Sequence, residues 1–341
     1  MSFVRTVRGD LDPALLGRVN YHEHLFQVSP LLPGDELDDE AASGAEAALL
    51  VASGFDAMID ATPSGLGRNP EALARISLAA GLAIVATTGA HREAHYPTDH
   101  PIRGLSASER AERYLDELLH GMPRRDVVRN EGAENGGPRN DSPLIDDENP
   151  RASDDTGAPV RAGLIKAGIG YWSITPFERA TLEAVAAAHV ETGAPVMVHL
   201  EFCTAAHEAL DLLAIDGVPA DRVVLAHADR DPNPALHLEL AARGAWLGYD
   251  GMARPRTRSD AELLDLTSAV VEGGASAQIL LGGDVARRTR YLAYGGMPGL
   301  AYLGERYLPQ LRARIGTDAV EQMLTANPQR FLAWSGPSRA P

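Results

Sequence analysis

Short apolar segments alternate with amphipathic stretches of helical periodicity along this chain. This alternation is typical of repeated strand–helix units that build a parallel sheet. The apolar segments predict eight strands, at residues 18–24, 57–62, 83–88, 162–167, 195–200, 223–227, 245–249 and 279–283. Eight such units in 341 residues predict an α/β fold in which residues 1–341 form a single (β/α)8 TIM barrel.

Helix boundaries between these strands are marked by residues with known capping roles. Residues 106–109 (Ser-Ala-Ser-Glu) and 175–178 (Thr-Pro-Phe-Glu) have the spacing of capping boxes, so each predicts the start of a helix. The last helix is expected to stop at residues 327–328 (Asn-Pro), because proline interrupts a helix.

One segment departs from this pattern. Residues 123–159 are rich in Asp, Glu, Asn, Gly, Pro and Arg and have almost no apolar periodicity. Such a composition buries too little apolar surface to offset the entropy of ordering. We expect a flexible insertion between the third helix and the fourth strand, and we interpret it as a surface loop rather than a lid or a partner-docking segment.

Charge and cysteine content narrow the functional classes. A formal net charge of −16 disfavours nucleic acid and anionic membranes as partners. Cys203 is the only cysteine, so neither an intrachain disulfide nor a multi-cysteine metal site can form, which suits a reducing cytosol. No secretory signal and no membrane-spanning apolar run is visible. We expect a cytoplasmic protein with a small-molecule substrate, and a homodimer stays open as its oligomeric state.

Two histidines stand together at the end of the first predicted strand. Residues two apart on a strand point to the same side, so His22 and His24 are expected to project together into the barrel, with Glu23 on the other side. Burying two imidazoles side by side costs solvation unless something binds them. A bound cation is the simplest explanation.

Four other polar residues end later apolar segments: Lys166, His199, His227 and Asp284. Their separations fit one strand–helix unit each, and two units between His227 and Asp284. The C-terminal ends of barrel strands are where TIM-barrel active sites lie. A single histidine there could be a satisfied core residue, but six ligand-type residues at strand ends predict a metal site.

Lys166 is an unusual member of a cation site. A buried ammonium next to divalent cations would be repelled and would lose its proton. A neutral amine can react with carbon dioxide to give a carbamate, whose two oxygens can bridge two metals. An N-carboxylated Lys166 is therefore the interpretation that makes this residue chemically sensible.

The ligand set resembles that of the phosphotriesterase family in the amidohydrolase superfamily. Further similarity lies at residues 20–25, 161–166, 192–196, 282–284 and 307–311, and at 327–328. The resemblance implies that His22, His24 and Asp284 hold a buried metal, that His199 and His227 hold a more exposed one, and that Lys166 bridges both. Zinc is the default metal for such ligands, and manganese or cobalt are alternatives.

Two departures from the family pattern concern the substrate. Lactonases of the family usually carry tyrosine after the Thr-Gly of the third strand, where this chain has His91 after Ala90. They also tend to carry a basic residue after the seventh-strand aspartate, where Gly251 follows Asp250. The loops after strands seven and eight are instead rich in arginine. Expected substrate residues are His91, Arg254, Arg256, Arg287 and Arg288.

The implied chemistry is hydrolysis of an ester, lactone or phosphoester by a hydroxide that bridges two metals, with Asp284 as ligand and general base. Arginines near the site favour a small anionic substrate, such as a phosphorylated lactone, although they could simply offset surface carboxylates. Two alternatives stay open: a non-catalytic binding protein built on the barrel scaffold, and an amide or cyclic-amide hydrolase of the same superfamily.

Overall fold

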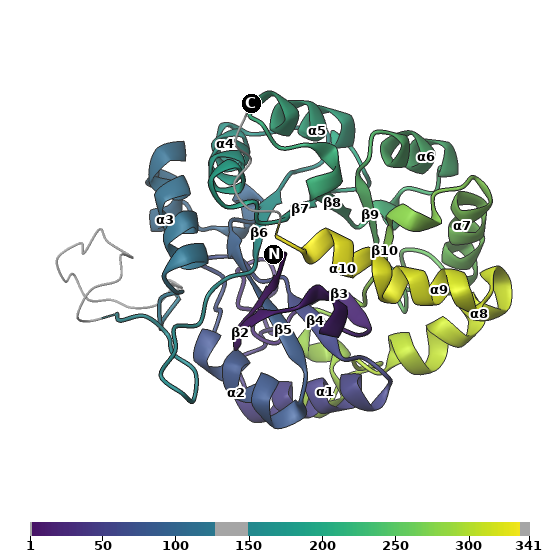
Figure 1. Cartoon of the computed structure of the whole chain (residues 1–341), viewed down its shortest axis with the longest axis horizontal. Coiled ribbons are helices and arrows are strands. Elements are labelled where there is room, and N and C mark those ends of the chain that lie inside the picture. The colour runs from purple at the N-terminus through teal and green to yellow at the C-terminus, as the bar shows by residue number, and fades with distance from the viewer. Residues whose placement is uncertain (1, 127–148, 335–341) are drawn as a thin grey trace.

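The fold is a parallel (β/α)8 barrel, as the alternation of segments predicts (Figure 1). The computed structural model describes residues 2–126 and 149–334. Within this part, eight strands pair in sequence order. They are β3 (Val19–Glu23), β4 (Ala57–Asp60), β5 (Ala83–Gly89), β6 (Leu164–Gly168), β7 (Val196–His199), β8 (Val223–Ala226), β9 (Trp246–Tyr249) and β10 (Ile279–Leu281). Each overlaps its predicted segment, so the strand predictions are confirmed.

The first and last strands meet through a few specific contacts. The backbone N–H of Asp284 donates to the carbonyl of His22 at 2.9 Å, and that of Gly283 donates to Asn20 Oδ1 at 3.2 Å. A Cβ at Gly282 would lie 2.9 Å from the backbone nitrogen of His22. Glycine is therefore required at position 282, and these contacts hold two predicted metal ligands from opposite ends of the sequence side by side.

Helices surround the sheet and cover its outer surface (Figure 1). They are α1 (Glu40–Ala52), α2 (Pro70–Ala80), α3 (Ala107–Leu119), α4 (Pro176–Thr192), α5 (Ala206–Ile215), α6 (Pro234–Ala242), α7 (Asp260–Glu272) and α8 (Leu308–Ile315). Both predicted capping boxes are confirmed, at Ser106 before α3 and at Thr175 before α4. No helix in residues 2–126 or 149–334 is long and apolar enough to cross a membrane.

The N-terminal end of the barrel is covered by both ends of the described chain. The hairpin of β1 (Val4–Thr6) and β2 (Gly9–Leu11) lies beside α10 (Ala326–Leu332) over the barrel opening, and α9 (Thr317–Leu324) packs against α10 (Figure 1). Phe3 pairs with Trp334, whose indole N–H donates to the carbonyl of Gly163 just before β6. This end is closed, which leaves the opposite end for a functional site.

The predicted end of the last helix is wrong. Asn327 and Pro328 lie in the first turn of α10, which runs on to Leu332. Proline is tolerated there because the first helical N–H groups have no partner within the helix. The Asn327 side-chain amide donates to the carbonyls of Ser276 and Ile279, both at 2.8 Å, and so ties the start of α10 to β10.

Side chains alternate between two apolar layers along the strands. In β8, Val224 and Ala226 belong to the cluster inside the barrel, whereas Val223 and Leu225 pack against the helices. In β6, Leu164 belongs to the inner cluster. A residue two positions further along the same strand points the same way, so this alternation aims Lys166 into the barrel.

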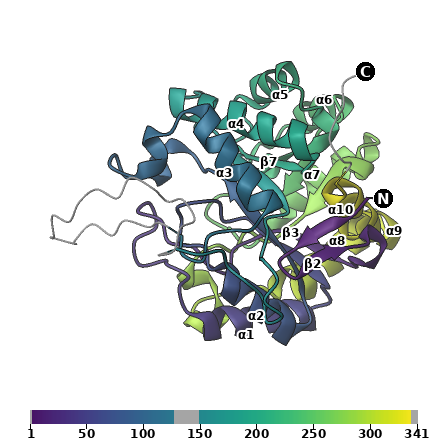
Figure 2. The same cartoon turned by 60° about the vertical axis from the view of Figure 1, so that its left-hand side comes forward.

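Both ends of the predicted insertion are bonded to the barrel, whereas its centre, residues 127–148, lies outside the described residues. The Asp126 carboxylate accepts the backbone N–H groups of Gly65, Leu66, Gly67 and Arg68 at 2.9–3.1 Å. On the other side, Ala152 is fully buried; its backbone N–H donates to the carbonyl of Met122 and its carbonyl accepts from Val160. Figure 2 shows the two ends lying beside α3.

Candidate metal centre

All six predicted metal ligands line one cavity of about 520 Å³ at the C-terminal ends of the strands. They are the six residues singled out from the sequence: His22, His24, Lys166, His199, His227 and Asp284. All six are buried. His227 and Asp284 have positive φ angles of 63° and 41°, which residues other than glycine rarely adopt. Such strain clusters at functional sites, where the surrounding structure holds it in place.

His22, His24 and Asp284 form the first group. The pairing register of β3 with β4 shifts between Asn20 and Glu23, and both imidazoles line the cavity. Asp284 Oδ1 lies 3.9 Å from His22 Nε2 and 3.7 Å from His24 Nε2. These atoms are close enough for all three residues to hold one cation.

The tautomer of His24 follows from its neighbour. The Thr62 hydroxyl donates to the carbonyl of Phe26 at 2.8 Å, so it is left to accept from His24 Nδ1 at 2.7 Å. The proton of His24 is therefore on Nδ1, and the lone pair of Nε2 faces Asp284. This is how a second residue fixes the orientation of a metal-binding histidine.

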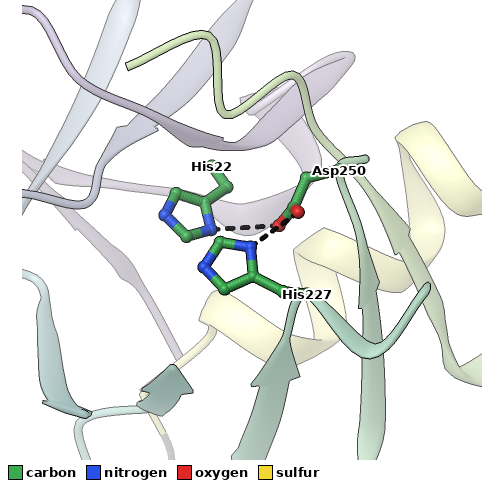
Figure 3. Close-up of side chains that lie close together, drawn as sticks. All are labelled: His22, His227 and Asp250. Atoms are coloured by element: carbon green, nitrogen blue, oxygen red, sulfur yellow. Dashed lines mark hydrogen bonds and ion pairs between the residues drawn. The ribbon is translucent and has the colours of Figure 1, made fainter. Parts of the chain in front are cut away.

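Asp250 joins the site at the end of β9 and connects its two halves (Figure 3). Its Oδ1 lies 2.7 Å from His227 Nδ1 and its Oδ2 lies 3.2 Å from His22 Nδ1. The Tyr21 hydroxyl also donates to this carboxylate. We did not include Asp250 among the predicted ligands, although it ends the seventh strand as Asp284 ends the eighth.

His227 and His199 form the second group. The Asp250 carboxylate accepts from His227 Nδ1, which leaves the lone pair of His227 Nε2 facing His199 Nδ1 at 2.8 Å. On its other side, His199 Nε2 lies 2.9 Å from Glu201 Oε1. A neutral imidazole carries one proton, so His199 cannot donate to both neighbours at once. A cation next to its ring would remove this conflict.

Burial controls the charge of these groups. It lowers the pKa of His24 and His199 well below the usual range and that of His227 to about 4, so all three are neutral at pH 7. For Asp284, burial works to raise the pKa, but nearby positive charge, that of Arg254 first, lowers it well below the usual range, so the carboxylate is ionised at pH 7. Neutral imidazoles and an ionised carboxylate are the forms that bind metals.

Lys166 is 1% exposed, and its ammonium donates to the carbonyl of Ala61 at 2.8 Å. Burial lowers its pKa to about 8, although Asp284 and Asp250 act in the opposite direction. The neutral fraction near pH 7 is therefore far larger than that of an ordinary lysine, although the charged form still predominates. The neutral amine is the form that carbamate formation requires.

The donor set fits bound cations. Among the described residues, neither ring nitrogen of His22 has a hydrogen-bond partner, although Nδ1 lies close to Asp250. Buried polar atoms are almost always hydrogen-bonded, so the unpaired Nε2 of His22 calls for a ligand. Nitrogen and oxygen donors in this combination suit zinc and its neighbours.

The predicted substrate residues divide into two sets. His91, Arg254 and Arg287 line the cavity. The His91 ring centre lies 4.4 Å from that of His199, and Arg254 Nη2 lies 2.5 Å from Asp284 Oδ2. Arg287 is exposed at the rim.

Arg256 and Arg288 are not among the described residues that line the cavity. Arg256 is exposed to solvent. Arg288 donates to Asp38 at 3.0 Å, and its guanidinium lies over the Tyr294 ring at 5.0 Å. Asp38, just before α1, and Tyr294, after β10, hold Arg288 away from the metal ligands.

Several cavity residues were missed from the sequence. Glu201 forms ion pairs with Arg92 at 3.2 Å and with Arg230 at 3.6 Å, and Arg230 also lies 3.5 Å from Asp284. His95 stacks on His91, with ring centres 3.8 Å apart. These residues stand two to six positions beyond a strand end. Their direction depends on loop geometry that no periodicity reveals.

Fold and site together define the class, a (β/α)8 barrel with a metal-binding set at its catalytic end. The model of the phosphotriesterase family matches residues 2–128 and 143–332, so the chain belongs to this family. The Escherichia coli phosphotriesterase homology protein is 28% identical over 83% of this chain and 85% of that protein. The phospho-furanose lactonase of Mycoplasmopsis agalactiae is 28% identical over 98% and 92%.

A solved lactonase structure from Listeria monocytogenes has the same architecture. Its TM-score is 0.83 at 27% identity, and the match covers 98% of this chain and 100% of that one. Family, relatives and site identify the chain as a metal-dependent hydrolase.

Proposed function

We propose that the chain is a binuclear metal-dependent hydrolase of ester, lactone or phosphoester bonds. His22, His24 and Asp284 would hold one cation, His199 and His227 the other, and an N-carboxylated Lys166 would bridge them. Zinc is the expected metal, with manganese or cobalt as alternatives. The observation that carries this proposal is the convergence of six buried ligand-type side chains on one cavity, where His22 Nε2 has no hydrogen-bond partner among the described residues.

Two bound cations would supply a hydroxide for attack at neutral pH and an electrophile for the substrate oxygen. The chain's own residues would do the rest. Asp284 Oδ2, ionised and flanked by Arg254 and Arg230, would accept the proton released during attack. Asp250 would hold the His227 proton on Nδ1 and so keep Nε2 directed into the cavity.

A small anionic substrate fits the charge of the cavity wall. Arg92, Arg230, Arg254 and Arg287 all line the cavity of a chain whose net charge is −16. Arginine binds carboxylate or phosphate through paired hydrogen bonds. Relatives that act as phospho-furanose lactonases support a phosphorylated lactone as the substrate class.

A substrate panel tests this proposal. The zinc-loaded protein would be assayed on matched lactones with and without a phosphate or carboxylate tail, on phosphoesters and on amides. We expect lactone hydrolysis with a gain in kcat/KM from the anionic tail, and a smaller gain in Arg287→Ala. Cleavage of amides alone would support the amide-hydrolase alternative. Tight binding without turnover of any substrate would support a binding protein.

A further inference from the structure

Three exposed aromatic side chains gather beside the mouth of the cavity. Tyr171, Trp172 and Phe202 are 61%, 73% and 44% exposed. The ring centre of Tyr171 lies 6.2 Å from that of Trp172 and 6.2 Å from that of Phe202, with interplanar angles of 80° and 84°. Single exposed apolar residues are ordinary, but a contiguous patch of large rings usually marks a binding surface. These three residues are called the aromatic platform below.

The platform is continuous with the metal site. Phe202 itself lines the cavity that holds the metal ligands, as does Leu31 from the loop after β3. Tyr171 and Trp172 lie in the loop after β6, three and four residues beyond its last residue, Gly168. The backbone N–H of Trp172 donates to Thr204 Oγ1 at 3.1 Å, which ties this loop to the loop after β7.

The backbone of the platform is held in an unfavourable conformation. Trp172 and Phe202 have φ angles of 53° and 55°, in the left-handed region that glycine adopts easily and aromatic residues rarely adopt. The chain thus combines backbone strain with solvent exposure of two large rings. Such strained positions cluster at ligand-binding sites.

We propose that the aromatic platform binds an aryl ring of the substrate while the cavity arginines hold its anionic group. This inference rests on the proposed function and adds to it an aryl group as part of the substrate. Rings at right angles can offer a face to one side of an aryl group and an edge to another. The arginines that line the same cavity, such as Arg230 and Arg287, supply the complementary charge.

Binding can be measured without turnover because Trp172 reports on the platform. The other two tryptophans, Trp246 and Trp334, are 6% and 3% exposed. The zinc-loaded full-length protein would be titrated with 4-phenylbutyrate and, as a matched carboxylate without an aryl ring, with hexanoate. We expect 4-phenylbutyrate to change the tryptophan emission and to bind about 10-fold more tightly than hexanoate. Trp172→Phe should remove the emission change.

Affinity would be compared among variants by calorimetry. Tyr171→Ala and Trp172→Ala should each weaken 4-phenylbutyrate binding by about 3- to 10-fold and leave hexanoate less affected. Ile215→Ala is the matched control, because Ile215 is 80% exposed and lies at the end of α5, outside the cavity lining. This control should bind both acids as the unaltered protein does.

Failure of the platform and failure of the proposed function give different results. Aryl selectivity in the binding titration without hydrolysis of any ester would retain the platform and overturn the proposed function. Hydrolysis of lactones together with equal affinity for 4-phenylbutyrate and hexanoate would overturn the platform. A dimer in sedimentation that Trp172→Ala dissociates, with unchanged affinity for both acids, would show that the platform is instead a contact between copies of this chain.

Discussion

Asp250→Asn is expected to weaken metal binding although Asp250 is not a predicted metal ligand. The carboxylate is fully buried, lies 2.7 Å from His227 Nδ1 and accepts from the Tyr21 hydroxyl. Burial raises the pKa of Tyr21 well above its usual range, so Tyr21 remains a donor. An asparagine offers one acceptor oxygen and one N–H2 group to two donors. If the amide N–H2 group faces His227, the ring must carry its proton on Nε2 and lose its metal-binding lone pair there; if it faces Tyr21, the carboxylate charge and the Tyr21 hydrogen bond that support the His227 orientation are lost.

Removal of such a supporting partner typically lowers metal affinity about 10- to 100-fold, or about 1.4–2.7 kcal/mol. Zinc affinity would be measured by competition with a chromogenic chelator, and stability by urea unfolding. Glu46→Gln is the matched control, because Glu46 is equally buried and its carboxylate accepts from Ala293 and Leu300 away from the site. We expect Glu46→Gln to lose stability and keep its zinc affinity. Unchanged zinc affinity in a folded Asp250→Asn protein would refute the reasoning.

Four further changes have defined outcomes. Asp284→Asn should lower turnover about 100- to 1,000-fold, because it removes a proton acceptor that is also a ligand. Circular dichroism should show that the fold is retained. Activity within a few-fold of that of the unaltered protein would contradict this role. Burial lowers the pKa of His237 to about 4 against about 6.5 in the unfolded chain. The free energy of unfolding is therefore unaffected by this group above about pH 6.5 and falls by about 3 kcal/mol as the pH drops toward about 4. In urea unfolding, His237→Gln should make the free energy of unfolding less dependent on pH in this range. An unchanged pH dependence would argue against this role of His237. Asp126→Ala should destabilise the fold by about 3–5 kcal/mol, because four N–H groups and Arg68 lose a buried carboxylate. Deletion of residues 127–148 should leave metal content and activity largely intact. Loss of activity in a folded deletion variant would favour the lid interpretation instead.

Much of the fold and of the metal-binding set follows from the sequence, because both depend on strand periodicity. A residue that ends an apolar strand must lie at one end of a parallel barrel. This is enough to bring His199 and Asp284 to the same end, although they are 85 positions apart in the sequence. The direction of loop side chains does not follow in this way. Arg288 turns to Asp38 and Tyr294, whereas Arg230 turns into the cavity, and only the surrounding loops decide between these outcomes.

Asp250 shows a second limit. Its position at the end of a strand is visible in the sequence, but its role depends on the distances to His22 and His227, which three strands set together. The end of the last helix was misplaced for a related reason. Proline marks the first turn of a helix as well as the residue after one, and the amide contacts of Asn327 with the carbonyls near β10 settle which applies.

The central claim is that His22, His24, Lys166, His199, His227 and Asp284 together hold two cations. Elemental analysis of the purified, dialysed protein tests it most directly, with Lys166→Ala beside it. We expect two tightly bound divalent ions per chain in the unaltered protein and fewer in the variant, and a crystal structure of the loaded protein should show Lys166 carboxylated. At most one tightly bound ion per chain in the unaltered protein, or an unmodified Lys166 in a fully loaded crystal, would contradict the proposed centre.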